Sequence, residues 1–436
     1  MTKRYHNSMQ FTSLKRRKVT ANFDGGEITT DGGVLLLREI DQKLKLTEAV
    51  NRAIRDTRHP SYRIHSQLTL IRQRIFGLAL GYEDLNDHIH LRHDGALQTA
   101  AGELSSLGSA STLCRLEQRA EAETAFALHE VLVDQFISSF KRAPRKLVLD
   151  FDATHDLVYG DQEGRFFNGF YDGYCFLPLY VFCGKQLLVS YLRPSSRGAA
   201  YHAGAILKLL AVKLRNAWPE VKLVFRADAG FCKPLILNWC DRHHVDYVVG
   251  ISKNSVLTGK AELLRKILQA LYSLKNKDQR RFGEFQYKAK SWPHARRVIV
   301  KAEYNSKGEN TRYVVTTLNS TPRKLYQEDY CYRGDMENRI KEQKSLFSDR
   351  TSCHQWWPNQ LRLLFSGFAY LLIDTLRRTV LANTEMANCQ VDTLRLKLFK
   401  IGGIVIRNTR SIRLLFSSNY PYQHLFARTA EHLNSS

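Results

Sequence analysis

The sequence predicts a mixed α/β protein with an all-helical N-terminal domain, and three observations lead to this expectation. Apolar residues recur at helical spacing from residue 30 to about residue 140. Near residue 145 the pattern changes to short alternating segments typical of strands, separated by helical ones. With 436 residues, 44% of them hydrophobic, the chain can bury a sizeable core, which excludes a wholly disordered protein.

The charge balance favours a polyanionic partner. Lys and Arg number 65 against 42 Asp and Glu, which gives a formal net charge of +23. Nucleic acid neutralises such an excess, and the spread of the charge along the chain argues against a membrane surface. The longest apolar run, residues 363–373, is too short to cross a bilayer, so we expect no membrane association.

The cysteines and the N-terminus indicate a cytoplasmic location. None of the eight cysteines falls in a C-x2-C pair, so the sequence supports neither a disulfide framework nor a zinc ribbon. A reducing compartment fits these free thiols. The first residues are basic and have no apolar stretch, so we expect no signal peptide.

The N-terminal part, residues 1–140, is expected to combine a basic arm with a helical module that binds DNA ends. The first twenty residues have no acid, and such a run is typically a solvated or disordered arm that orders on phosphate. Helical spacing follows, first over residues 35–46 and then over residues 68–80. The basic residues of the arm are Lys3, Arg4, Lys15, Arg16, Arg17 and Lys18.

Residues 141–251 show the strand order expected of a ribonuclease-H-like core. Three strands in a meander are followed by helix, strand, helix and strand, which makes a mixed sheet with helices on its faces. The predicted strands are 146–152, 174–183, 186–192, 221–227 and 246–251, and the predicted helices are 202–215 and 231–242.

A β insertion is expected at residues 252–325, because segments 281–289, 297–304 and 311–318 alternate at period two. From residue 253 to residue 301 there are 13 Lys and Arg against 3 Asp and Glu, which indicates a track for DNA phosphates. The following helical stretch, residues 326–385, should complete the core. Residues 386–436 form a basic, β-like C-terminal segment.

Acidic residues stand at the ends of two predicted strands. Asp150 and Asp152 lie two apart, so their side chains point to one face, and Asp228 directly follows an apolar strand. Open α/β sheets bind ligands at the carboxyl ends of their strands. If the two strands are neighbours, the acids converge there, and Mg²⁺ is the natural ion to relieve their repulsion.

A third acid, Glu337, lies in a predicted helix with an aromatic residue and two cations on its face. Tyr330, Arg333 and Lys344 lie within about 60° of Glu337 around a regular helix. A surface helix of mixed charge is the alternative explanation. A phosphodiester site would use the same residues, with the acid on the metal and the cations on phosphates.

At these residues the sequence resembles a known family. The pattern Y-(2)-R-(3)-E-(6)-K at Tyr330, Arg333, Glu337 and Lys344 is similar to the signature of a subgroup of bacterial insertion-sequence DDE transposases. A companion signature, D-(1)-G-(F/Y), is matched from Asp228 to Phe231. The segments FDGGEITTDGGVLLLREID, FFNGFYDGYCFLPLYVF and RLKLFKIGGIVIRNTR look like the family numbered thirteen-eighty, so the likeness runs over nearly the whole chain.

The resemblance implies a ribonuclease-H-like, retroviral-integrase-like core with its β insertion between the second and third acids. It implies Asp152, Asp228 and Glu337 as catalytic residues that bind two Mg²⁺ ions, with Mn²⁺ as a substitute. Asp150 is the alternative first acid, and Thr154 favours Asp152 because relatives place a threonine shortly after this acid. Trp292 is the candidate for accommodating a flipped base, and packing within the β layer is the alternative. The implied DNA-binding residues are Tyr330, Arg333, Lys344, Trp292, Arg296 and Arg297.

The implied activity is transposition: binding of terminal inverted repeats, DNA cleavage, and transfer of 3′-hydroxyl ends to target DNA. The partners would be both DNAs and a second copy of the chain, in a synaptic complex associated with the bacterial nucleoid. Two alternatives stay open. One is a catalytically silent DNA-binding protein derived from such an element, and the other is a nuclease of the same fold without strand transfer.

Overall fold

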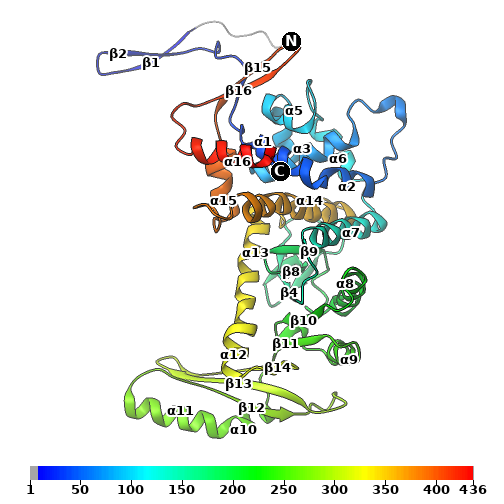
Figure 1. Cartoon of the computed structure of the whole chain (residues 1–436), viewed down its shortest axis with the longest axis vertical. Helices are drawn as coiled ribbons and strands as arrows, with labels where there is room; N and C mark the ends of the chain where they lie inside the picture. The colour runs from blue at the N-terminus through cyan, green and yellow to red at the C-terminus, as the bar shows by residue number, and fades with distance from the viewer. Residues whose placement is uncertain (1–7, 436) are drawn as a thin grey trace. The chain divides into compact units, whose positions relative to one another are not determined.

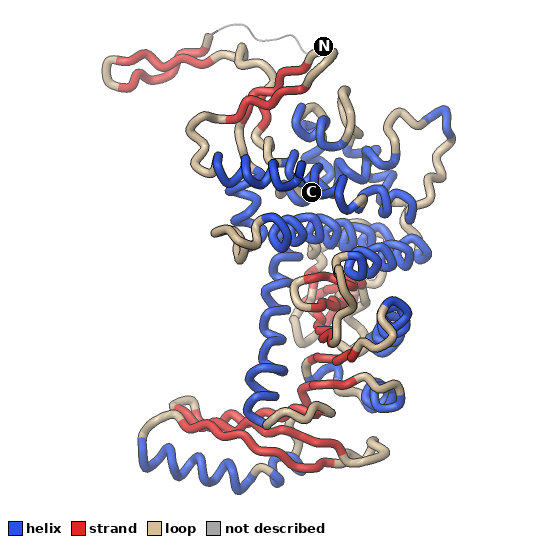
Figure 2. Tube along the Cα trace, viewed as in Figure 1, coloured by secondary structure: helices blue, strands red, loops and turns tan. Residues whose placement is uncertain are grey.

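The computed structural model describes residues 8–435, and the contacts divide the chain into two compact units. The first unit combines residues 1–119 with residues 368–436, and the second unit is residues 120–367. This division differs from the expected boundaries at residues 140 and 385. Residues 120–140 pack with the second unit because helix α7 (Ala122–Ser138) lies against strand β9 (Gln186–Tyr191). Figures 1 and 2 show the elements of each unit.

The second unit is built on one mixed eight-stranded sheet with the order β12-β13-β14-β11-β10-β4-β8-β9. The expected mixed α/β sheet is therefore confirmed. Strands β4, β10 and β11 are parallel. Strand β8 runs antiparallel to β4, and β9 runs antiparallel to β8 and therefore in the direction of β4. The strands are β4 (Lys146–Ala153), β8 (Leu179–Cys183), β10 (Lys222–Ala227), β11 (Asp246–Ile251), β12 (Gln279–Tyr287), β13 (Arg296–Asn305) and β14 (Gly308–Thr316).

The inserted strands β12–β14 form an extension of the central sheet. Their antiparallel character agrees with the period-two pattern, but β14 pairs with β11 over Val248↔Thr316 to Ile251↔Tyr313. The free edge of β11 is thus covered, so the insertion joins the sheet edge to edge where a separate layer was expected. Helices α10 (Ser255–Lys260) and α11 (Glu262–Lys275) precede these strands.

Side-chain alternation gives the two faces of the sheet different tasks. Leu149, Phe151 and Phe225 point into the large apolar core with helices α8 (Ala203–Ala217) and α9 (Pro234–Arg242). Val224, Val248 and Ile299 point to the opposite face and pack against Leu325 and Tyr326. Asp150 and Asp152 share the parity of Val148, so they belong to this second face.

A helical segment of three different geometries covers the second face. It begins with α12 (Pro322–Lys324) and the π-helical turn η4 (Leu325–Tyr330), and continues through the 3₁₀ turn η5 (Cys331–Arg333) into α13 (Gly334–Ser345). Figure 1 shows α13 on one side of the central strands and α8 and α9 on the other. The expected single regular helix is therefore interrupted just before the third acid.

In the first unit the N-terminal and C-terminal segments form one structure. Strand β15 (Gly403–Arg407) pairs with both β3 (Ile28–Thr29) and β16 (Ile412–Phe416). The buried Asp31 accepts hydrogen bonds from Lys400 Nζ at 2.7 Å and from Tyr82 Oη at 2.6 Å. The helices are α1 (Val34–Leu44), α2 (Leu46–Ala53), α3 (Gln67–Leu80), α4 (His88–Leu91), α5 (Gly95–Ala101), α6 (Ala110–Glu117), α15 (Val391–Leu394) and α16 (Gln423–Ser435), and α14 (Trp356–Thr375) crosses the unit boundary.

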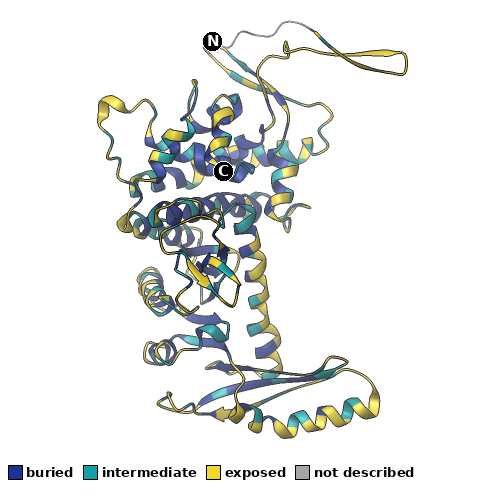
Figure 3. Ribbon diagram, turned by 180° about the vertical axis from the view of Figure 1, so that it is seen from behind, coloured by how far each residue is buried: buried dark blue, intermediate teal, exposed yellow. Residues whose placement is uncertain are grey.

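The basic arm contains a β-hairpin where the sequence indicated no regular structure. Strands β1 (Met9–Leu14) and β2 (Arg17–Ala21) pair, with Lys15 in the left-handed region at the turn. Figure 3 shows both strands exposed. Phe11 and Val19 are cross-strand partners, and such a pair supplies the local stabilisation that the charge pattern does not reveal. Lys3 and Arg4 lie outside the described residues.

Among residues 8–435, the helices are all too short or too polar to cross a bilayer.

The close approach of Gly33 to the backbone of Leu398 and Phe399 predicts an effect on stability. Gly33 N donates to Phe399 O at 3.1 Å, and a Cβ on Gly33 would lie 1.9 Å from Leu398 O. These are backbone atoms that cannot turn away, so we expect Gly33→Ala to lower the free energy of unfolding by about 1–3 kcal/mol. Chemical denaturation measures the change. Gly402→Ala is the control, because a Cβ there meets nothing within 4 Å, and equal stability of both variants would contradict the packing described.

Candidate active site

Asp152 and Asp228 lie side by side at the carboxyl ends of neighbouring parallel strands. The register of β4 and β10 pairs Phe151 with Ala227, so the next residue of each chain segment is one of these acids. Asp228 begins a 3₁₀ turn (Ala229–Phe231), and its carboxylate accepts the Gly230 N–H at 2.8 Å. The strand pairing therefore brings together the first two acids of the expected triad.

Arg333 links the third acid to the first. Its Nη1 donates to Asp152 Oδ2 at 3.1 Å, and its Nη2 lies 3.7 Å from Glu337 Oε1. Burial opposes the charged form, yet the carboxylates of Asp152, Asp228 and Glu337 raise the pKa of Arg333. One guanidinium thus lies in the field of all three acids.

The pKa of Asp152 reflects its burial and the charges around it. Burial raises the pKa of Asp152 to about 6, Arg333 opposes the rise, and Asp228 and Glu337 add to it. The Glu337 side chain is 60% exposed, while that of Asp152 is 12% exposed. The site therefore has two acids fixed at the sheet edge and a third that reaches it from solvent.

Tyr330 approaches the same place through a gap left by a glycine. A Cβ on Gly250 would lie 2.6 Å from Tyr330 Oη and 2.9 Å from Ala229 N. Burial raises the pKa of Tyr330, and the nearby Asp228 contributes to the rise. Gly250 was not singled out from the sequence, although a glycine inside an apolar strand is a known signal of close approach by another group.

Asp150 has a different environment from Asp152. Its carboxylate pairs with the guanidinium of Arg226 on the neighbouring strand β10, with Arg226 Nη2 at 2.7 Å from Oδ2. Arg226 Nη1 also donates to Asp329 O at 2.5 Å. Asp150 therefore holds the arginine that joins β10 to the turn η4, which favours Asp152 as the first acid.

Lys344 lies over a buried carboxylate that the sequence did not single out. Its Nζ donates to His155 O at 2.8 Å and lies 3.5 Å from Asp156 Oδ1. Asp156 is fully buried, and burial raises its pKa to about 7, while Lys344 opposes the rise. A pocket of about 260 Å³ opens here, lined by His155, Asp156, Leu157, Tyr159, Lys344, Asp349 and Arg350.

Trp292 and Arg296, which the resemblance implied as DNA contacts, are both buried. Trp292 is 5% exposed and packs against Tyr287, with the Arg296 guanidinium 4.9 Å from its ring centroid. Arg296 donates to Tyr247 Oη at 3.0 Å and to Asp241 at 2.6 Å. The packing alternative therefore describes Trp292, and neither side chain is accessible to a base or a phosphate.

Arg297 is likewise engaged within the protein. Its guanidinium donates to Glu284 Oε2 at 3.0 Å and to the carbonyl oxygens of Leu318 at 2.5 Å and Ser320 at 2.8 Å. Some basic residues of the insertion thus hold strands and loops together.

Three other cations of the insertion, Arg280, Lys301 and Arg312, line a polar pocket of about 440 Å³. Glu303 pairs with two of its cations, Arg280 and Lys301, so the pocket keeps a net positive charge through Arg312. Phe282 and Tyr326 form an aromatic wall, with ring centroids 5.7 Å apart. The lining residues are Arg280, Phe282, Lys301, Asn310, Arg312, Tyr326, Gln327 and Cys331.

A small aromatic sheet follows Asp152 in the chain, and only one of its strands falls in a predicted segment, since the expected strand 174–183 divides into β7 and β8. Strands β5 (Asp156–Leu157), β7 (Gly173–Phe176) and β6 (Phe166–Asn168) pair in that order. Tyr171 stacks on His155 at 4.2 Å, and Asp152 and Asp228 contribute to a pKa of Tyr171 that burial has already raised. The exposed aromatic residues of this region are Tyr159, Phe166, Phe167, Phe170 and Tyr174.

The three acids offer the donors that a hard divalent ion prefers, namely carboxylate oxygens. Within residues 8–435, no three acidic, histidine or cysteine side chains are already arranged to enclose a metal ion. Arg333 supplies the compensating charge between Asp152 and Glu337. The Glu337 side chain is 60% exposed and pairs with Arg333, so the donor set fits a cation that replaces this guanidinium.

Comparisons with known proteins identify one matching family. A family model described as "Transposase DDE domain group 1" matches residues 11–436. A search of curated proteins found no match. Among solved structures, one titled "Cryo-EM structure of piggyBac transposase synaptic complex with hairpin DNA" is 12% identical, covers 85% of this chain and 80% of that chain, and has a TM-score of 0.39.

The different environments of Asp150 and Asp152 predict different stabilities of their amide variants. Asp150→Asn leaves the Arg226 guanidinium without its buried partner, which should cost about 3–5 kcal/mol of unfolding free energy. Asp152→Asn should cost less, because Arg333 keeps Glu337 and Asp228 beside it. Urea denaturation of the two variants measures the difference, and the opposite order of stability would contradict the assignment of Asp150 to structure.

Asp156 predicts a pH dependence of stability. Its folded pKa of about 7 lies above the ordinary 3.8, so the folded protein holds a proton that the unfolded chain releases. Stability from this group is therefore lost as the pH rises from about 4 to about 7. Asp156→Asn should flatten the decline of the melting temperature over this range. An unchanged slope, measured by calorimetry at several pH values, would show that Asp156 titrates normally.

Proposed function

The chain belongs to the transposase DDE domain group 1 family and is thus a DDE-type transposase; from this premise we propose that it cuts DNA at terminal inverted repeats and joins the freed 3′-hydroxyl ends to target DNA. The observation that carries the proposal is the convergence of three acids on Arg333 at the carboxyl edge of the sheet. Paired carboxylates beside cations suit phosphoryl transfer, in which positioning and charge stabilisation do most of the catalysis.

The finer family assignment is also part of the proposal. The Y-(2)-R-(3)-E-(6)-K spacing from Tyr330 to Lys344 supports the insertion-sequence subgroup of that signature and the family numbered thirteen-eighty. In the strand order β9-β8-β4-β10-β11, only β8 runs antiparallel to the other four strands. This arrangement supports a ribonuclease-H-like core.

DDE transposases generally act with divalent metal ions, and we assign two Mg²⁺ ions, replaceable by Mn²⁺, to Asp152, Asp228 and Glu337. When bound, such ions polarise the phosphate and lower the pKa of an attacking water. Asp152 and Asp228 are placed rigidly by their strands, whereas Glu337 reaches the site from α13. Arg333, released from the carboxylates, would then hold a phosphate oxygen next to the reacting bond.

The remaining roles follow from accessibility. Tyr330 lies against Gly250 and would orient the end of a DNA strand near Asp228. Lys344 would bind a phosphate further along α13. We assign the contacts between the β insertion and the DNA backbone to Arg280, Lys301 and Arg312 of the polar pocket, in place of the buried Trp292 and Arg296.

The partners proposed are two DNAs and a second copy of this chain. The first unit would bind the inverted repeat, since it contains the exposed basic hairpin β1–β2. Two protomers would hold the paired ends in a synaptic complex, so that both ends reach one target. Such chemistry acts on chromosomal DNA, which places the protein at the bacterial nucleoid.

Glu337→Gln tests the catalytic assignment. The variant keeps the shape of the side chain but loses a metal-binding carboxylate, so cleavage of end DNA in Mg²⁺ should fall by on the order of 10²- to 10⁴-fold. Gel analysis of labelled duplexes from the flanks of the coding region measures the rate.

The matched control is Glu328→Gln, an exposed acid on the turn η4 that pairs only weakly with Lys324 at 4.0 Å. Cleavage by this variant should equal that of the unchanged protein. Persistent cleavage by Glu337→Gln would remove Glu337 from the triad. Binding without any cleavage by the unchanged chain would identify a silent DNA-binding protein, and nicks without joined products would identify a nuclease.

A further inference from the structure

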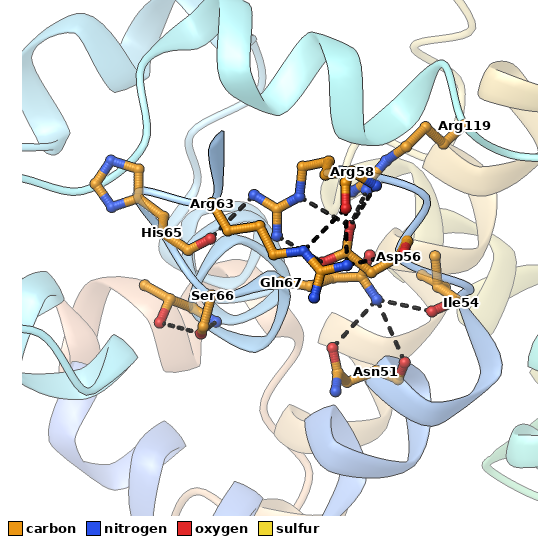
Figure 4. Close-up of polar contacts among 10 residues, drawn as sticks. Asn51, Ile54, Asp56, Arg58, Arg63, His65, Ser66, Gln67 and Arg119 are labelled. Atoms are coloured by element: carbon orange, nitrogen blue, oxygen red, sulfur yellow. Dashed lines mark hydrogen bonds and ion pairs between the residues drawn. The ribbon is translucent and has the colours of Figure 1, made fainter. Parts of the chain in front are cut away.

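The loop between α2 and α3, residues 54–66, is held by an unusual arrangement of charges at its base. Asp56 accepts hydrogen bonds from Arg58 Nε at 2.9 Å and Nη2 at 2.8 Å, and from Arg119 Nη1 at 2.6 Å (Figure 4). Arg63 Nε lies 3.6 Å from the same carboxylate. The hydrogen bonds from Arg58, first of all, hold the pKa of Asp56 well below its ordinary value.

The same arginines fix the backbone of the loop. Arg63 donates to Arg58 O at 3.0 and 2.7 Å, and Arg58 Nη1 donates to His65 O at 3.0 Å. Gln67 Nε2 closes the base through Ile54 O at 2.7 Å (Figure 4). These hydrogen bonds join residues 54–58 to residues 63–67, so the two limbs of the loop are fixed to each other before any partner binds.

This rigid loop presents two large apolar side chains to solvent. Tyr62 is 80% exposed and Ile64 is 89% exposed, while Arg63 between them turns back to the loop base. A single exposed apolar residue needs no explanation, but two close together on a loop fixed by arginine hydrogen bonds mark a contact surface.

The positive charge around the loop indicates the chemical class of its partner. Arg52, Arg55, Arg58, Arg63, Arg92 and Arg119 lie on or beside the loop with Asp56 and Glu103, so six positive charges stand against two negative ones and leave a net charge of four. A polyanion complements this surface. Apolar side chains next to cations suit duplex DNA, where apolar residues enter a groove and cations contact the flanking phosphates.

We propose that the loop at residues 54–66 is a DNA-binding wedge, in which Tyr62 and Ile64 pack against bases in a groove of the element's end and Arg55 contacts a phosphate. The inference rests on the proposed function and specifies how the first unit recognises DNA. The network around Asp56 acts as the positioning device, because it holds the wedge in its binding conformation before DNA arrives.

The test is the double variant Tyr62→Ser/Ile64→Ser in the full-length protein. Fluorescence anisotropy with a labelled duplex from the flank of the coding region should show binding weakened by about 10- to 100-fold. The dependence of affinity on salt should stay the same, because no charge is removed. Arg55→Gln should instead reduce the slope of that dependence by about one.

Leu104→Ser is the matched control, since Leu104 is a 74% exposed apolar residue of the same unit. It should bind DNA like the unchanged protein. Full affinity in the double variant would overturn the wedge, and so would a loss of self-association with unchanged DNA binding, because the loop would then be a contact between copies. If the double variant cleaves end DNA normally, the proposed function survives this failure; if the unchanged chain neither binds nor cuts such DNA, the proposed function fails.

Discussion

The ion pair between Arg333 and Asp152 joins segments 181 residues apart, and the geometry of the site depends on it. Two parallel strands end in acids, and a buried cluster of like charges is unstable unless a cation lies among them. Arg333 provides that cation and at the same time fixes the start of α13, from which Glu337 extends. Divalent metal ions would meet the same electrostatic need, and Arg333 would then be available to pair with a DNA phosphate.

A second arginine separates structure from chemistry on the same strand. Arg226 engages Asp150, which lies only two residues from Asp152, and also binds a carbonyl of the turn before Tyr330. Both acids share one face of β4, but only Asp152 is at the strand end where Asp228 follows β10. Position along the strand thus separates the two acids: the inner acid pairs with Arg226 within the fold, and the outer acid is the one that we propose for the reaction.

Local patterns predicted much of this architecture, and non-local contacts account for what they missed. Alternation and helical spacing indicated strands β4, β10 and β11 and the position of both strand-end acids, because these features depend on near neighbours. The burial of Arg296 beside Trp292 depends on hydrogen bonds to Asp241 and Tyr247, which belong to other elements. The pairing of Gly33 with Phe399, and of Asp31 with Lys400, makes one unit from both ends of the chain, a relation that no local period contains. The turn η4 replaces regular helix where Leu325 and Tyr326 must pack on the sheet.

The central claim is that Asp152, Asp228 and Glu337 hold divalent ions at one place. Fe²⁺ can replace Mg²⁺ at such a site and, with peroxide and a reductant, cuts the polypeptide next to its own ligands. Mass spectrometry of the fragments should find cuts adjacent to all three acids, and excess Mg²⁺ should suppress the three cuts together. Cuts beside one acid only, or at unrelated positions that Mg²⁺ does not affect, would contradict a shared metal site.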